Sequence, residues 1–131
     1  MFKFCNIKNF YQKNQKIFNQ YKKFLIVGEM GYGKTNFIRS ICFYILNFNN
    51  IVSPTYTYYK QYSINNFALW HFDFYRMNQY DFNQYTNEIH NNDYVFIEVD
   101  PCKFDSIKDY ISSDYLIVYI KVLNNKQFIS F

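Results

Sequence analysis

Residues 24–35 read FLIVGEMGYGKT and contain the strongest structural signal in the sequence. The run FLIV is short and apolar, which is typical of a buried strand. GEMGYGKT at 28–35 follows it and fits the pattern G-x-x-x-x-G-K-[ST] between a strand and a helix. The pattern predicts a phosphate-binding loop (P-loop), because glycine lets the backbone turn its N–H groups toward phosphate oxygens, which the following helix also attracts.

The composition makes a chance match improbable. The 131 residues include 16 Phe and 15 Tyr but only three Gly, and all three lie in the loop, as Gly28, Gly31 and Gly33. The abundant residue types have AT-rich codons, so we interpret much of the composition as genomic bias. Glycines that persist against this bias indicate a backbone requirement. In such a loop, Lys34 would reach the β and γ phosphates and Thr35 would present its hydroxyl to Mg²⁺.

A P-loop also needs an acid near the magnesium ion. Residues 94–97, YVFI, predict a second buried strand, and it ends in Glu98. Asp100 is two residues further on, so both acids share one face if the strand continues. Either carboxylate could serve, and a solvent-facing acid at a strand end is the structural alternative.

Two further segments carry rare residues. Residues 70–76, WHFDFYR, contain the one Trp, one of two His and one of two Arg. Asp73 there could orient or deprotonate an attacking water, or could form a surface ion pair with Arg76. Residues 53–57, SPTYT, could close over a nucleotide as a switch loop or form an ordinary turn.

The remaining pattern predicts an α/β fold: a single P-loop NTPase-like domain over residues 1–131 with a mixed β-sheet flanked by helices. The turn signals are the pairs Asn65-Asn66 and Asn124-Asn125, which favour hairpins. The expected helices are an amphipathic helix over 7–21, then 35–48, a weak one within 79–91, and 104–111; the expected strands are 23–27, 55–62, 67–74, 94–97, 115–123 and 127–131.

Charge and composition exclude several classes of protein. Half of the residues are hydrophobic, which excludes a disordered chain, and no apolar run approaches the ~20 residues that span a bilayer. The net charge is +4, and residues 1–28 hold six Lys and no acid. A transit peptide or an RNA-binding patch could explain this, but helical spacing favours a structural helix with a solvated Lys face. Three cysteines without a C-x-x-C pair indicate reduced thiols, and we expect a cytoplasmic protein.

The motifs together resemble the TsaE (YjeE) family, the P-loop ATPase of tRNA threonylcarbamoyladenosine synthesis. The family pattern runs G-D-L-G-A-G-K-T, S-P-T-Y-T, H-F-D-L-Y-R and a strand with E-W-P. This chain has GEMGYGKT at 28–35, SPTYT at 53–57, HFDFYR at 71–76 and IEVDP at 97–101, so the resemblance spans about 23–101.

The resemblance implies ATP and Mg²⁺ as cofactors, Thr35 and Glu98 as magnesium ligands, and Asp73 and Glu98 as catalytic residues. It implies TsaB and TsaD as partners, with tRNA reached only through that complex. Two alternatives remain open: a nucleotide-gated subunit without significant hydrolysis, and a small P-loop kinase, which the scarcity of Arg disfavours. The residues expected to bind ATP are Met30, Gly31, Tyr32, Gly33, Lys34, Thr35 and Asn36.

The sequence departs from the family pattern at several positions. Val99 stands where the family has Trp, and Asp100 is inserted before Pro101. Tyr32 replaces a small residue in the loop, so we expect its ring to point outward. A basic residue in the family's C-terminal hairpin often contacts the base, and Lys126 is the nearest candidate here.

Overall fold

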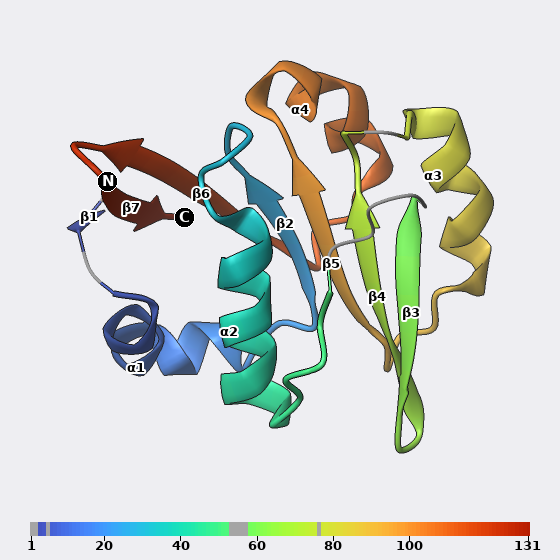
Figure 1. Ribbon diagram of the computed structural model, residues 1–131. Helices are drawn as coiled ribbons and strands as arrows, with labels where there is room; N and C mark the ends of the chain where they lie inside the picture. The colour runs from blue at the N-terminus through green and yellow to red at the C-terminus, as the bar shows by residue number, and fades with distance from the viewer. Residues whose placement is uncertain (1–2, 5, 53–57, 76) are drawn as a thin grey trace.

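A seven-stranded mixed sheet with helices on both faces forms the protein (Figure 1). The computed structural model describes residues 3–4, 6–52, 58–75 and 77–131. The predicted SPTYT segment, Arg76 and Cys5 lie outside the described residues. The elements are β1 (Lys3–Phe4), α1 (Ile7–Phe18), β2 (Lys23–Val27), α2 (Lys34–Leu46), β3 (Tyr59–Ile64), β4 (Phe67–Asp73), α3 (Gln79–Tyr85), a 3₁₀ turn (Thr86–Glu88), β5 (Tyr94–Val99), α4 (Pro101–Ile107), a 3₁₀ turn (Lys108–Tyr110), β6 (Tyr115–Leu123) and β7 (Lys126–Ser130).

The strand order is β1-β7-β6-β2-β5-β4-β3. The four central strands, β6, β2, β5 and β4, are parallel, whereas β3, β7 and β1 join at the two sides in antiparallel pairs. The carboxyl ends of parallel strands meet at one edge of a sheet, which is where α/β proteins bind ligands. At this edge Glu98 is in register with Asp73 of β4 and with Ile26 of β2.

Both expected hairpins are present. Asn65 joins β3 to β4 with a φ of 51°, and Asn124 and Asn125 join β6 to β7 with φ values of 52° and 60°. Asn adopts this left-handed conformation more readily than most residues, which is why the Asn pairs predicted the turns.

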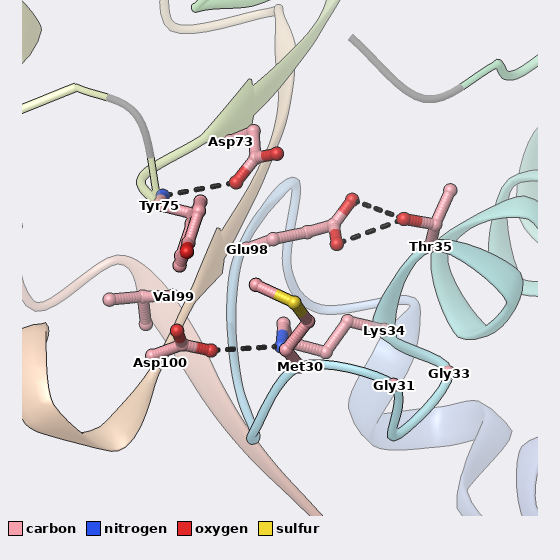
Figure 2. A pocket seen from close by; sticks show the side chains of 10 residues that line it. All are labelled: Met30, Gly31, Gly33, Lys34, Thr35, Asp73, Tyr75, Glu98, Val99 and Asp100. Atoms are coloured by element: carbon pink, nitrogen blue, oxygen red, sulfur yellow. Dashed lines mark hydrogen bonds and ion pairs between the residues drawn. The ribbon is translucent and has the colours of Figure 1, made fainter. Parts of the chain in front are cut away.

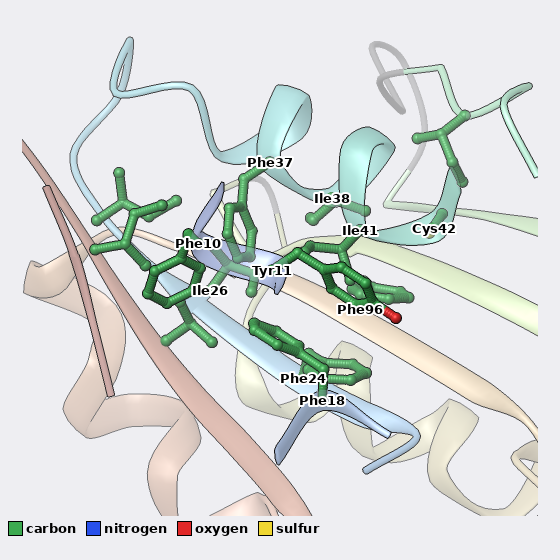
Figure 3. Close-up of a cluster of buried hydrophobic side chains, with 14 of the residues drawn as sticks. Phe10, Tyr11, Phe18, Phe24, Ile26, Phe37, Ile38, Ile41, Cys42 and Phe96 are labelled. Atoms are coloured by element: carbon green, nitrogen blue, oxygen red, sulfur yellow. The ribbon is translucent and has the colours of Figure 1, made fainter. Parts of the chain in front are cut away.

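Two hydrophobic clusters hold the helices on the sheet. On one face, α1 and α2 pack against β2 and β5, where the rings of Phe24 and Phe96 stack with centroids 4.8 Å apart (Figure 3). The buried side chains of α1, Phe10, Tyr11 and Phe18, confirm the amphipathic helix predicted there. On the other face, α3 and α4 contribute Phe82 and Ile107 to the second cluster. Successive side chains of β4 and β5 point to opposite faces of the sheet, so every second residue of these strands faces α2.

Some boundaries differ from expectation. α1 ends at Phe18 rather than Tyr21, and β3 begins at Tyr59. The fourth helix begins at Pro101 rather than Phe104, because Pro suits the first helical turn, and its last expected residues form a 3₁₀ turn. The two-residue strand β1, which pairs with β7, was not predicted.

Across the residues that the structure describes, none of the helices has the length and apolar character needed to cross a bilayer.

Candidate phosphate-binding site

A cavity of about 470 Å³ lies at the carboxyl edge of the central strands (Figure 2). Its walls come from the P-loop, the start of α2, and the ends of β4 and β5. The lining residues are Met30, Gly31, Gly33, Lys34, Thr35, Asp73, Tyr75, Glu98, Val99 and Asp100. Segments that are far apart in the sequence therefore converge on one site.

The P-loop takes its shape from glycine. Gly31 and Gly33 both have a φ of +84°, in the left-handed region that strains residues with a Cβ. Gly33 is also the N-cap of α2, so the loop leads directly into the helix. The loop is fastened to β5 at its other end, where the Gly28 N–H donates to the Val99 carbonyl at 3.1 Å.

Lys34 is buried, with 9% of its surface exposed. Its ammonium group donates to the carbonyls of Gly28 and Glu29, the latter at 2.9 Å. It also lies 3.3 Å from Oδ1 of Asp100 (Figure 2). The cation is thus held at the base of the loop, beside the cavity.

The Thr35 hydroxyl faces the carboxylate of Glu98. Thr35 Oγ1 lies 2.9 Å from Oε1 and 2.8 Å from Oε2, as the dashed lines in Figure 2 show. Glu98 is only 6% exposed. Behind it, Nε2 of the fully buried His71 lies 2.5 Å from Oε2.

Asp73 ends β4 beside Glu98, and its Oδ1 accepts a hydrogen bond from the Tyr75 N–H at 3.0 Å. Burial raises the pKa of the Asp73 carboxyl above its ordinary value, and the charge of Glu98 acts in the same direction. The Tyr75 hydrogen bond and the nearby His71 and Lys34 act in the opposite direction without reversing the shift. Such a carboxyl holds a proton more readily than an exposed one does.

The structure brings most of the predicted site residues to the cavity. Of the seven residues expected to bind ATP, only Tyr32 and Asn36 do not line it. Asn36 is exposed on α2. Tyr32 is half-buried and packs against the cluster under α1 and α2.

Asp100 and Glu98, which the sequence left as alternatives, both reach the cavity but contact different residues. His71 was not predicted as part of the site. Strand alternation could have indicated it, because it lies two residues before Asp73 on the same face.

The C-terminal hairpin contacts the P-loop through Gln127. Gln127 Nε2 donates to the Tyr32 carbonyl at 2.9 Å. Lys126 lines a separate cavity beside Asn6 and Tyr44.

The donor set fits magnesium. No group of three or more His, Cys, Asp or Glu side chains that could hold a metal occurs among the described residues. Mg²⁺ does not need one, since it takes oxygen ligands, keeps several waters and is often held by one or two protein groups plus substrate phosphates. Thr35 and Glu98 provide two such oxygen donors at the mouth of a phosphate-binding loop.

The loop, its lysine and the acid at the end of the adjacent strand define a P-loop α/β protein. Comparison of structures supports the fold: the crystal structure of YdiB from Bacillus subtilis superposes with a TM-score of 0.60 at 21% identity, covering 98% of this chain and 84% of that one.

Comparison of sequences gives the family. The sequence model described as "Threonylcarbamoyl adenosine biosynthesis protein TsaE" matches residues 4–127. A relative from Rickettsia typhi named tRNA threonylcarbamoyladenosine biosynthesis protein TsaE is 32% identical over 106 residues, which are 79% of this chain and 71% of the relative. A relative of the same name from Rickettsia felis is 41% identical over 54 residues, 40% of this chain and about a third (32%) of its own length. The chain belongs to the TsaE family of tRNA threonylcarbamoyladenosine biosynthesis.

Proposed function

We propose that the chain binds ATP with Mg²⁺ in the 470 Å³ cavity and hydrolyses it as an accessory subunit acting with TsaB and TsaD. The observation that carries the proposal is the convergence of Lys34, Thr35 and Glu98 on one cavity. A lysine, a hydroxyl and a strand-end carboxylate are the groups that P-loop NTPases use for phosphate and magnesium.

Each residue has a defined task in this proposal. The P-loop N–H groups and the start of α2 bind the phosphates, and Lys34 exchanges one of its backbone carbonyl partners for a phosphate oxygen. Thr35 and Glu98 would hold magnesium, which would supply positive charge to offset the negative charge that develops on the phosphates. Asp73, with its raised pKa, orients the attacking water and accepts its proton.

The arginine content supports dependence on partners. Arg39 donates its Nε–H to the Ile51 carbonyl, and no arginine lines the cavity among the described residues. An arginine supplied in trans is worth ~10³–10⁵ in turnover in other P-loop proteins. Met30 and Tyr75, which line the cavity, are 64% and 49% exposed, so the cavity opens on a surface that a partner can reach.

The convergence of Lys34, Thr35 and Glu98 on one cavity also fits a second candidate, a nucleotide-gated subunit that binds ATP but does not hydrolyse it. Steady-state release of phosphate separates the two. We expect slow turnover by the isolated chain and at least a tenfold rise with TsaB and TsaD present. ATP binding without phosphate release in the complete mixture would support the second candidate. Absence of ATP binding would overturn both.

A further inference from the structure

His71 is a buried polar residue that the proposed mechanism does not use. Its side chain is fully buried in β4 and faces α2, on the same side of the sheet as Asp73. β4 and β5 are parallel neighbours, with His71 opposite Phe96 and Asp73 opposite Glu98. Glu98 therefore lies diagonally across from the His71 ring, within reach of one ring nitrogen.

The contact is close and directional. His71 Nε2 lies 2.5 Å from Oε2 of Glu98, and the carboxylate can only accept at that contact while it is ionised. The tautomer with its proton on Nε2 satisfies this geometry. Nδ1, the other ring nitrogen, is buried and has no hydrogen-bond partner among the described residues. Within that part of the chain, the ring hydrogen-bonds to Glu98 alone.

The Glu98 carboxylate is consequently fixed from two sides. Thr35 contacts it from the start of α2, and His71 contacts Oε2 from β4. A glutamate side chain has three rotatable bonds, and ordering it costs conformational entropy on each binding event unless neighbours hold it in place. Carboxylates that ligate metals are commonly held by such outer hydrogen bonds, and removing one typically costs 10–100-fold in metal affinity.

We propose that His71 is a positioning residue for magnesium: its Nε2–H orients the Glu98 carboxylate toward Thr35 and the cavity. This inference rests on the proposed function, because it assigns His71 a role only where Glu98 is a magnesium ligand. His71 itself touches neither nucleotide nor metal.

The test measures the magnesium requirement of ATP binding by calorimetry, in the full chain and without reference to turnover. His71→Leu keeps an apolar volume but removes the donor, whereas His71→Gln places an amide N–H near the position of Nε2. We expect the Leu variant to need 10–100-fold more Mg²⁺ for half-maximal effect, with ATP affinity in EDTA unchanged. The Gln variant should stay within about threefold of wild type.

Circular dichroism and thermal melting establish that each variant is folded. If the Leu variant does not fold, His71→Asn replaces it, because its shorter amide does not reach Glu98; it should be impaired relative to His71→Gln. A folded Leu variant with the wild-type magnesium requirement overturns the inference and leaves the proposed function standing. Equal impairment of folded Leu and Gln variants, or of folded Asn and Gln variants, also overturns it. A wild-type chain whose ATP binding does not respond to Mg²⁺ overturns the proposed function itself, and this inference with it.

Discussion

Thr35 and Glu98, 63 residues apart in the sequence, are in direct contact in the wall of the cavity, with the Thr35 hydroxyl 2.8 and 2.9 Å from the two carboxylate oxygens. The start of α2 supplies one residue and the end of β5 supplies the other. Because β5 lies directly beside β2, the strand that leads into the P-loop, the sheet itself sets their separation. The proposed magnesium site is thus a consequence of strand order.

Replacing Lys34 should weaken ATP binding. The amine is held beside the cavity by loop carbonyls and is the cation nearest to the phosphate position that we propose. A hydrogen bond to a charged group contributes about 1.5–3 kcal/mol, so Lys34→Ala should weaken binding by about 10- to 10²-fold. Calorimetric titration with ATP measures this. Lys108→Ala, which removes an exposed lysine in the 3₁₀ turn after α4, is the matched control. Wild-type affinity in a folded Lys34→Ala variant would contradict the assignment.

Substitutions of Glu98, in β5, and of Asp100, directly after β5, should differ in their effects on the magnesium requirement. Glu98 contacts Thr35, whereas Asp100 contacts Lys34. Glu98→Gln should therefore raise the Mg²⁺ concentration needed for turnover by about 10–100-fold, and Asp100→Asn should change it far less. The measurement is phosphate release against Mg²⁺ concentration in the complex with TsaB and TsaD. Equal or reversed effects would assign the metal to Asp100.

Asp73→Asn separates catalysis from structure. The amide keeps the shape and can still accept the hydrogen bond from the Tyr75 N–H, but it cannot take a proton from water. We expect ATP affinity to stay nearly unchanged and single-turnover hydrolysis to fall by ~10²–10⁴-fold. A variant that keeps its turnover and loses only stability would show that Asp73 is structural.

Asp93 should contribute to stability at neutral pH. It is 3% exposed and accepts hydrogen bonds from the Ala68 N–H, the Trp70 indole and the His90 N–H. Burial alone would raise the pKa of Asp93, but these hydrogen bonds outweigh it and lower the pKa. A carboxyl whose pKa is lower in the folded state than in the unfolded state stabilises the fold at pH values above its unfolded pKa, which is about 3.9. This contribution is lost as the pH falls through the folded-state pKa.

Asp93→Asn should accordingly reduce the free energy of unfolding by about 2–3 kcal/mol at pH 7. The difference from wild type should shrink below about pH 4. Urea denaturation at several pH values measures it, with the exposed Asp105→Asn as control. A pH-independent difference would mean that the loss comes from packing and not from the carboxylate charge.

The cysteines that the structure describes should differ in reactivity. Cys42 is fully buried in α2, and burial raises the pKa of its thiol, whereas Cys102 is exposed on α4. Iodoacetamide should modify Cys102 in the native protein and Cys42 only after denaturation, because the thiolate is the reacting form. Peptide mapping by mass spectrometry distinguishes the sites. Native modification of Cys42 at a comparable rate would show that α2 opens readily.

Local signals predicted much of this fold, and nonlocal contacts account for the differences. Glycines with positive φ, Asn turns and short apolar runs depend on neighbouring residues, so the P-loop, both hairpins and the central strands could be read from the sequence. The pairing of β1 with β7 depends on residues at opposite ends of the chain. The contact of Gln127 with the P-loop, and that of His71 with Glu98, depend on strand order, which residue spacing does not specify.

The proposed magnesium–ATP site is tested most directly by calorimetric titration of ATP into the wild-type chain, once with Mg²⁺ and once with EDTA. The cavity has one P-loop and one Thr35–Glu98 pair, so we expect a single saturable site. Affinity should be at least about tenfold higher with Mg²⁺, in line with the loss expected when a metal site is disturbed. Absence of saturable binding, or binding of equal affinity in EDTA, would contradict the assignment of this cavity as a magnesium–ATP site.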